Sequence, residues 1–304
     1  MINVKPFLKW AGGKTQVLSE LINKLPEIVT KSKIIDSYIE PFVGGGAFFF
    51  YLKNNYEVKK SYLLDINIEL IIGYKVIQNN PTELIKKLKK ISKLYFSKNK
   101  TRQCEFFYEI REIYNNQRIK FDYKNYNKEW IERVSYLIFL NKTCFNGLFR
   151  LNKSGGFNVP FGGYVKPKIC NEVNILEVNK ALKDTTIICG DFSNSEDYID
   201  KNSIVYFDPP YRPINKTSSF TTYSTNGFTD EDQKRLAHFY KKMSKKSAYL
   251  ILSNSDSKNN SEDDDFFDRL YKRFKIYRIL ANRMINSNGD KRGKISEILI
   301  TNYR

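Results

Sequence analysis

The chain has 304 residues, of which 41% are hydrophobic and 28% charged, so it can build a substantial core and is not disordered throughout. Its longest apolar runs fall far below the ~18 residues that a membrane helix needs, and its N-terminus lacks the apolar segment of a signal peptide. These features predict a cytoplasmic protein without a membrane partner. The 51 basic and 33 acidic residues give a net charge of +18, which favours a polyanionic partner such as a nucleic acid.

Residues suited to metal binding are scarce. His238 is the only histidine, and the four cysteines form no C-x-x-C pair. A histidine-rich zinc site or a Ser-His-Asp triad would have to use His238, which lies on a predicted exposed helix face. We therefore expect no metal.

The first part of the chain alternates strands and helices. A strand is predicted over Ser37 to Phe42, and it leads through three glycines into a helix from Ala47 to Asn54. A second strand, Ser61 to Ile66, is followed by a helix capped at Asn67. Near-continuous apolar strands followed by helices favour a parallel sheet that is covered on both faces.

The glycine turn after the first strand has the features of a nucleoside site. Glycines let the backbone approach a ligand, and the start of the next helix offers free N–H groups. Asp65 ends the next strand about 20 residues later, where a carboxylate can bind ribose hydroxyls. Phe49 occupies the last glycine position of a G-x-G-x-x-G motif, so a dinucleotide dehydrogenase is disfavoured. Gly12-Gly13-Lys14-Thr15 imitates a P-loop, but Leu8 replaces its first glycine, which argues against an NTPase.

The stretch from about Gly73 to Lys168 interrupts the alternation. A helix is predicted to begin at Asn80, whose Asn-Pro-Thr-Glu sequence matches a helix start. Two more helices are predicted over Cys104 to Asn115 and Lys128 to Leu140. Phe149 to Pro160 is then predicted to form a β-hairpin around a glycine-containing turn.

The alternation returns in the last part of the chain. Thr229 with Asp232 three residues later is a helix-start signature. Strands are predicted over residues 185–189, 204–207, 248–253, 275–280 and 297–303, and a helix over residues 266–271. We therefore expect an α/β domain formed by residues 1–72 and 169–304, with residues 73–168 as an inserted helical and β-hairpin domain.

Asp208-Pro209-Pro210-Tyr211 follows the apolar strand from Ile204 to Phe207. It thus occupies the carboxyl end of a strand, where open α/β sheets bind ligands. The two prolines fix the backbone and donate no N–H group. The loop therefore presents an acidic side chain, a rigid carbonyl oxygen and an aromatic ring together, which favours a functional loop over a simple turn.

Several motifs occur here in the order seen in Dam-type DNA adenine N6-methyltransferases (class alpha, D12 family), and the chain resembles that family from Pro6 to Tyr303. These motifs are residues 7–14, 40–47, 145–150, 156–164, 190–192, 208–211 and 292–297. The resemblance implies a Rossmann-like S-adenosylmethionine-dependent methyltransferase sheet, an inserted DNA-recognition domain, S-adenosylmethionine as cofactor and double-stranded DNA as partner. The cofactor contacts that it implies are Trp10, Lys14, Glu40, Phe42, Gly44, Gly46, Asp65, Asp191, Phe192 and Asp208, with Asp191 near the cofactor's adenine.

The resemblance also implies the chemistry. The Asp208 carboxylate and the Pro209 carbonyl would each accept one N6–H of an adenine flipped out of the duplex, and Tyr211 would stack on that base. Methyl transfer would be a direct in-line displacement that depends mainly on positioning.

DNA recognition is implied for seven residues: Lys9, Asn146, Leu148, Arg150, Asn158, Pro160 and Tyr164. The usual target of such a segment is GATC, and Arg150 would read a guanine while Leu148 and Pro160 meet thymine methyl groups. Gly163 stands where relatives often carry arginine, so one phosphate contact is expected to be lost.

The sequence is also compatible with other functions. Cytosine N4 methylation uses the same chemistry, whereas cytosine C5 methylation is excluded because no cysteine follows a proline. The basic insertion argues against a methyltransferase acting on RNA or on a protein amide. The intact Asp208-to-Tyr211 loop argues against a catalytically silent DNA-binding protein. The C-terminal motif resembles methylases of restriction–modification systems, and the sequence leaves open whether a restriction endonuclease for the same site is a partner.

Overall fold

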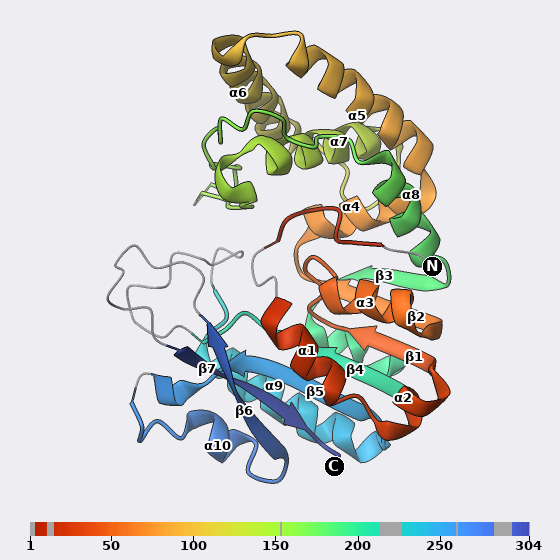
Figure 1. Ribbon diagram of the computed structural model, residues 1–304, viewed down its shortest axis with the longest axis vertical. Coiled ribbons are helices and arrows are strands. Elements are labelled where there is room, and N and C mark those ends of the chain that lie inside the picture. The colour runs from red at the N-terminus through yellow and green to blue at the C-terminus, as the bar shows by residue number, and fades with distance from the viewer. Residues whose placement is uncertain are drawn as a thin grey trace. The chain divides into compact units, whose positions relative to one another are not determined.

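The computed structural model describes residues 4–10, 15–152, 154–212, 227–259, 261–282 and 294–303. Its strands follow the order β3-β2-β1-β4-β5-β7-β6 in a mixed, mostly parallel sheet, which confirms the expected α/β class (Figure 1). The chain divides into two compact units. The helical unit comprises residues 1–13, 44–54 and 67–189, and the sheet unit comprises residues 14–43, 55–66 and 190–304.

The sheet unit holds six of the strands. They are β1 (Ile34–Glu40), β2 (Glu57–Asp65), β4 (Ser203–Phe207), β5 (Tyr249–Ser255), β6 (Lys275–Asn282) and β7 (Lys294–Thr301). Strands β2, β1, β4 and β5 are parallel neighbours, as predicted from their apolar runs. Every residue of β4 is buried, which is typical of a strand covered on both faces.

The far edge of this sheet differs from the expected parallel arrangement. Strand β7 runs antiparallel to both β5 and β6. Strands β6 and β7 follow each other in the chain, and antiparallel neighbours need no crossover helix between them.

The helices of the sheet unit are α1 (Thr15–Asn23), α2 (Glu27–Ser32), α9 (Asp230–Met243) and α10 (Phe266–Leu270), with short 3-10 turns η2 (Phe192–Tyr198), η4 (Ser244–Lys246) and η5 (Ser257–Asn259). The predicted start of α9 is confirmed, because Thr229 and Asp232 form a reciprocal capping box. Helices α1 and α2 were not predicted from the sequence.

The helical unit is built mainly from helices (Figure 1). They are α3 (Ala47–Asn55), α4 (Ile68–Asn79), α5 (Pro81–Phe96), α6 (Lys100–Gln117), α7 (Lys128–Thr143) and α8 (Glu172–Ala181), with the turn η1 (Phe145–Gly147) and strand β3 (Thr185–Cys189). Asn67 caps α4 as predicted, accepting from the N–H groups of Glu69 and Leu70. Asn80 does not cap α5 with its side chain, because its oxygen accepts a hydrogen bond from the Tyr126 hydroxyl instead.

The predicted hairpin is shorter than expected. One antiparallel bridge joins Leu151 and Phe157, and the Asn158 N–H donates to the Arg150 carbonyl at 3.1 Å. The Asn152 N–H donates to the Gly156 carbonyl at 2.8 Å and closes the turn. The chain therefore reverses where predicted, without extended strands on either side.

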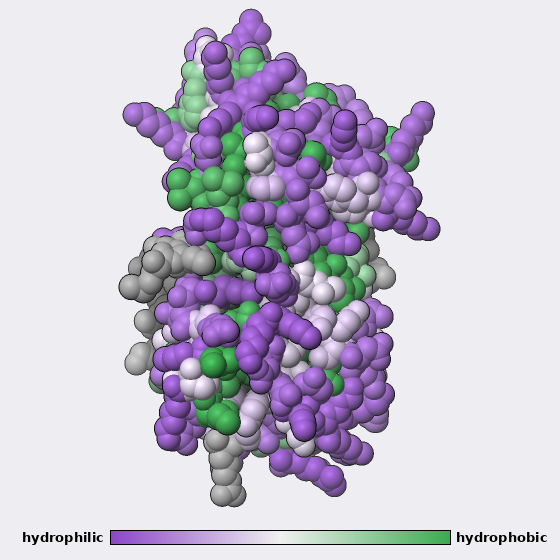
Figure 2. Space-filling model, turned by 90° about the vertical axis from the view of Figure 1, so that its right-hand side faces the viewer, coloured by the Kyte–Doolittle hydropathy of each residue, from purple (hydrophilic) through white to green (hydrophobic). Residues whose placement is uncertain are grey.

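The face of the molecule shown in Figure 2 is mostly hydrophilic, with hydrophobic residues in scattered patches. Across the described ranges, no helix has both the length and the apolar character needed to cross a bilayer. Nor does that part of the chain bring together three or more His, Cys, Asp or Glu residues that could hold a metal ion.

Candidate functional site

Three predicted cofactor carboxylates lie at one edge of the sheet unit. Glu40 ends β1, Asp65 ends β2, and Asp208 follows β4. Because β2, β1 and β4 are parallel neighbours, their carboxyl ends share that edge. The sheet therefore collects acidic groups where ligands of α/β proteins bind.

Glu40 is only 2% exposed, so its carboxylate needs partners within the protein. The Tyr38 hydroxyl donates to Glu40 Oε2 at 2.8 Å. Burial, followed by the charge of Glu40, raises the pKa of Tyr38 well above its usual value. Tyr38 therefore stays protonated and keeps donating to the carboxylate.

Asp208 is linked to the neighbouring strand by a chain of hydroxyl groups. The Ser253 hydroxyl donates to Asp208 Oδ1 at 2.9 Å, and Tyr206 Oη lies 2.9 Å from Ser253 Oγ. Burial, followed by the charge of Asp208, raises the pKa of Tyr206 well above its usual value. Since Ser253 gives its single proton to the carboxylate, Tyr206 is the donor to Ser253.

The loop after Asp208 is braced by polar groups from α9 and β5. Gln233 Nε2 donates to the Pro210 carbonyl at 3.1 Å, and Asn254 Nδ2 donates to Gln233 Oε1 at 3.1 Å. The Arg212 N–H donates to Asn254 Oδ1, and the Ser255 hydroxyl donates to the Arg212 carbonyl. These bonds hold the backbone around the two prolines in one orientation.

Tyr211 is fixed at its hydroxyl end. Its Oη donates to Glu297 Oε2 of β7 at 2.9 Å. Burial, followed by the charges of Asp208 and Glu297, raises the pKa of Tyr211 well above its usual value. The ring is therefore held as a neutral, oriented aromatic face next to Asp208.

Aromatic rings form a second feature of the sheet unit. The rings of Phe42 and Phe192 lie 5.6 Å apart, and Phe42 meets Phe228 edge-on at 5.7 Å. Phe192 is buried, at 2% exposure. The two predicted cofactor residues Phe42 and Phe192 are thus brought together.

The Asp191 carboxylate has a partner that the sequence did not indicate. Arg235 donates two hydrogen bonds to it, at 2.7 and 2.9 Å, and Ser193 donates a third. Burial acts to raise the pKa of Asp191, but the hydrogen bonds from Arg235 and Ser193 lower it to about 2. This carboxylate therefore joins η2 to α9.

The predicted glycine turn of the helical unit requires glycine. Gly44 and Gly46 have φ of +48° and +70°, and a Cβ on Gly46 would lie 2.6 Å from Tyr74 Oη, which donates to the Gly44 carbonyl. A Cβ on Gly44 would approach Trp10 to 3.1 Å. Trp10 also stacks on Phe149 at 5.1 Å, so it lies between the glycine turn and the predicted DNA-reading residues.

Residues 145–164, here called the recognition segment, bring the predicted DNA-binding residues together in pairs. Arg150 Nε donates to Asn158 Oδ1 at 2.8 Å. The Asn146 N–H donates to Tyr164 Oη at 2.9 Å, with Asn146 in the left-handed region at φ +57°. Asn158 therefore orients the guanidinium of Arg150.

Asn141 was missed by the sequence analysis. It is 1% exposed; its Oδ1 accepts from the Lys9 N–H, and its Nδ2 donates to the carbonyls of Lys9 and Gly147, each at 2.9 Å. Lys9 is thereby tied to the recognition segment, where Leu148 and Pro160 are exposed. A polar residue closing the apolar run from Tyr136 to Leu140 was the available signal.

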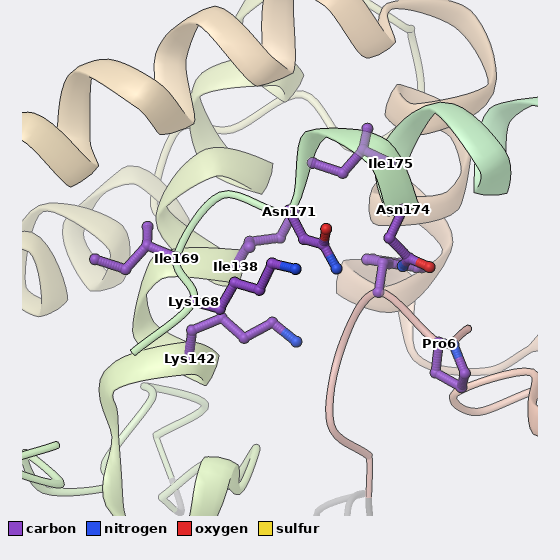
Figure 3. Close-up of a pocket in the computed structure, with 9 residues that line it drawn as sticks. Pro6, Ile138, Lys142, Lys168, Ile169, Asn171, Asn174 and Ile175 are labelled. Carbon is purple, nitrogen blue, oxygen red and sulfur yellow. The ribbon is translucent and has the colours of Figure 1, made fainter. Parts of the chain in front are cut away.

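One predicted cofactor residue and one hollow remain to be placed. Lys14 lies outside the described residues. A hollow in the helical unit contains none of the predicted site residues; the Lys142 and Lys168 side chains extend side by side into it (Figure 3). Burial lowers the pKa of Lys142.

Comparison with known proteins connects these features. Residues 10–285 match the family model described as D12 class N6 adenine-specific DNA methyltransferase. The chain is 49% identical over 304 residues to Type II methyltransferase M.MjaIII of Methanocaldococcus jannaschii, covering 99% of this chain and 100% of that protein. It is 33% identical over 296 residues to a DNA adenine methylase of Vibrio cholerae serotype O1, covering 97% and 95%. It is 31% identical over 295 residues to DNA adenine methylase of Escherichia coli K12, covering 97% and 94%.

Proposed function

This chain belongs to the D12 class of N6 adenine-specific DNA methyltransferases, and from that premise we propose that it methylates adenine N6 within GATC, after flipping the base out of the duplex. One observation carries the chemical part of the proposal. Asp208 stands at the end of β4 on a braced loop, with its carboxylate held by Ser253 and the Tyr211 ring fixed beside it. Relatives named DNA adenine methylase support the choice of adenine.

The residues at the sheet edge fit S-adenosylmethionine as cofactor. The cofactor carries positive charge on its sulfonium and amino groups and has a ribose diol, and Glu40, Asp65 and Asp208 offer carboxylates at one edge. When bound, S-adenosylmethionine would supply an electrophilic methyl group on sulfur. Its transfer would form one N–C bond, break one C–S bond with its electrons kept by sulfur, and release one N6 proton to water.

We assign the cofactor contacts to the residues given by motif position. Asp65 would accept hydrogen bonds from the ribose, and the turn through Gly44 and Gly46 would lie beneath the methionine part. The remaining proposed contacts are Trp10, Lys14, Glu40, Phe42, Asp191, Phe192 and Asp208. The arrangement of Phe42 and Phe192, 5.6 Å apart, supports an aromatic part of this site.

Adenine N6 is a poor nucleophile because its lone pair is delocalised into the ring. The Asp208 carboxylate and the Pro209 carbonyl would each accept one N6–H, so that the nitrogen becomes pyramidal and aims its lone pair at the methyl group. The braces on the Pro210 and Arg212 backbone support such a role, since they hold the acceptor carbonyl in place. Catalysis would then come mainly from positioning and local electrostatics.

Flipping the adenine costs a few kcal/mol. Stacking on Tyr211, worth about 1–3 kcal/mol, would offset much of that cost. Because Glu297 holds the hydroxyl of Tyr211, its ring is oriented in advance. Tyr211→Ala should therefore leave fluorescence of 2-aminopurine at the target position much lower than in the wild-type complex, and unchanged fluorescence would contradict the stacking role.

We assign sequence recognition to the inserted region, residues 73–168, together with Lys9. Arg150 is the proposed reader of a guanine, and its bond to Asn158 supports a fixed direction of approach. Asn146, Leu148, Pro160 and Tyr164 complete the proposed surface.

Protection of plasmid DNA tests the proposed target. Plasmid incubated with the protein and S-adenosylmethionine should resist an endonuclease that is blocked by N6-methyladenine in GATC. An isoschizomer that cuts regardless of that methyl group should still cut, which shows that the sites are intact. Complete cleavage by both enzymes after incorporation of labelled methyl groups would contradict GATC as the target.

A further inference from the structure

The hydroxyl of Ser253 is buried and donates to the Asp208 carboxylate. Strands β4 and β5 pair in parallel register, with Phe207 opposite Leu252. Asp208 follows Phe207 and Ser253 follows Leu252, so the strand register places this serine beside the acidic side chain. Ser253 is 0% exposed, so its hydroxyl does not face solvent.

We propose that Ser253, supported by Tyr206, is a positioning residue that sets the rotation of the Asp208 carboxylate for methyl transfer, an inference that rests on the proposed function. The carboxylate of a free aspartate turns about its Cβ–Cγ bond, and each turn moves both oxygens. A hydrogen bond of 2.9 Å to Oδ1 fixes that plane, and therefore fixes the direction of the second oxygen. An acceptor that is oriented in advance loses less conformational entropy when it accepts the N6–H hydrogen bond.

The direction of the hydroxyl chain makes this role specific. An ionised carboxylate can only accept hydrogen bonds, so Ser253 donates its single hydroxyl proton to Asp208. The Ser253 oxygen then accepts a hydrogen bond from the Tyr206 hydroxyl, 2.9 Å away. Tyr206 is buried in the middle of the sheet, at 2% exposure, so its ring cannot move away from the serine. This hydroxyl chain thus orients Asp208 from the interior of the sheet unit.

A matched control exists on the neighbouring strand, β4, which Asp208 follows. At the opposite end of β4, the Ser203 hydroxyl donates to Asp200 Oδ1 at 2.9 Å, and Ser203 is also 0% exposed. The two serines make the same bond to the same type of residue at the same distance. They differ in that Asp200 lies at the amino end of the strand, away from the carboxylate edge.

The test measures kcat and the KM values for a GATC duplex and for S-adenosylmethionine in four full-length proteins: wild type, Ser253→Ala, Ser203→Ala and Tyr206→Phe. Ser253→Ala should lower kcat by about 10- to 100-fold and leave both KM values within about threefold. Tyr206→Phe should lower kcat by a smaller factor, since Ser253 can still donate to Asp208. Ser203→Ala should retain kcat within about twofold, and thermal unfolding should show comparable folding of all four.

The outcomes distinguish failure of the positioning role from failure of the proposed function. Wild-type protein that forms no N6-methyladenine would overturn both. An active wild type with a Ser253→Ala variant within twofold of its kcat would overturn the positioning role alone. Equal losses in Ser253→Ala and Ser203→Ala, or a rise in KM that accounts for the whole loss, would overturn it too, because a general loss of folding or of binding would then be the cause.

Discussion

Replacing Glu69 by leucine should destabilise the helical unit by about 3–5 kcal/mol, because it leaves the buried charge of Arg133 without a partner. Arg133 donates to both oxygens of Glu69 from Nε, at 3.1 and 2.9 Å, and again to Oε1 from Nη2. The two side chains are 2% and 11% exposed. Arg133 Nη1 also donates to the Tyr114 carbonyl, so the guanidinium joins α4, α6 and α7.

The size of this effect follows from burial and not from the number of bonds. A buried pair that is broken on one side loses its Coulomb attraction but keeps the desolvation cost of the remaining ion. Arg133→Met should cost a similar amount, since Glu69 would then be the unpaired ion. The double variant Glu69→Leu/Arg133→Met should be more stable than either single variant, because no charge remains buried.

Urea unfolding followed by circular dichroism measures these free energies. The exposed pair Lys87–Glu132, with side chains 43% and 41% exposed, provides a control in the same unit. Lys87→Met should change the unfolding free energy by less than about 1 kcal/mol. The reasoning would be refuted by single variants at Glu69 and Arg133 that cost under 1 kcal/mol, or by a double variant that costs the sum of both.

Two other predictions concern recognition and acid stability. Arg150→Ala should weaken discrimination against the wrong base by about 1–3 kcal/mol at one guanine-containing pair of GATC. Methylation of duplexes that each carry a single base change measures this discrimination. A uniform loss of methylation with the order of preference intact would instead make Arg150 a phosphate contact. Asp191, with its pKa lowered to about 2 beside Arg235, contributes stability above its unfolded pKa of about 4, and this contribution is lost as pH falls through about 2. Arg235→Met should therefore reduce stability at pH 7 by about 1 kcal/mol after solvent screening, with the difference from wild type shrinking at pH 2; a difference independent of pH would contradict the pairing.

Local patterns allowed most of the fold to be predicted. The apolar run around Val205 predicted β4. The Thr229-to-Asp232 signature predicted the start of α9, because the two residues that form the capping box are only three positions apart. Asn80 carried a comparable signature, yet its side chain bonds to Tyr126, 46 residues further along. A local sequence pattern cannot predict that a residue so far along the chain will bond to the capping side chain.

The site shows the same division. Asp208 was recognisable because its loop follows its own strand in the chain, and the loop's prolines restrict the backbone locally. Ser253 and Glu297, which hold Asp208 and Tyr211, lie 45 and 86 residues further along the chain. Their roles depend on β5 lying beside β4 and on β7 lying beside β5, an order that no spacing along the chain encodes.

The identity of the methylated base tests the central claim most directly. A GATC duplex incubated with wild-type protein and S-adenosylmethionine, then digested to nucleosides and analysed by mass spectrometry, should contain N6-methyldeoxyadenosine and no N4-methyldeoxycytidine. Asp208→Ala should lower the yield by far more than tenfold while retaining DNA binding, since the carboxylate is proposed to contact the flipped base and the cofactor. N4-methyldeoxycytidine as the product, or an Asp208→Ala variant within tenfold of wild-type turnover, would contradict the account.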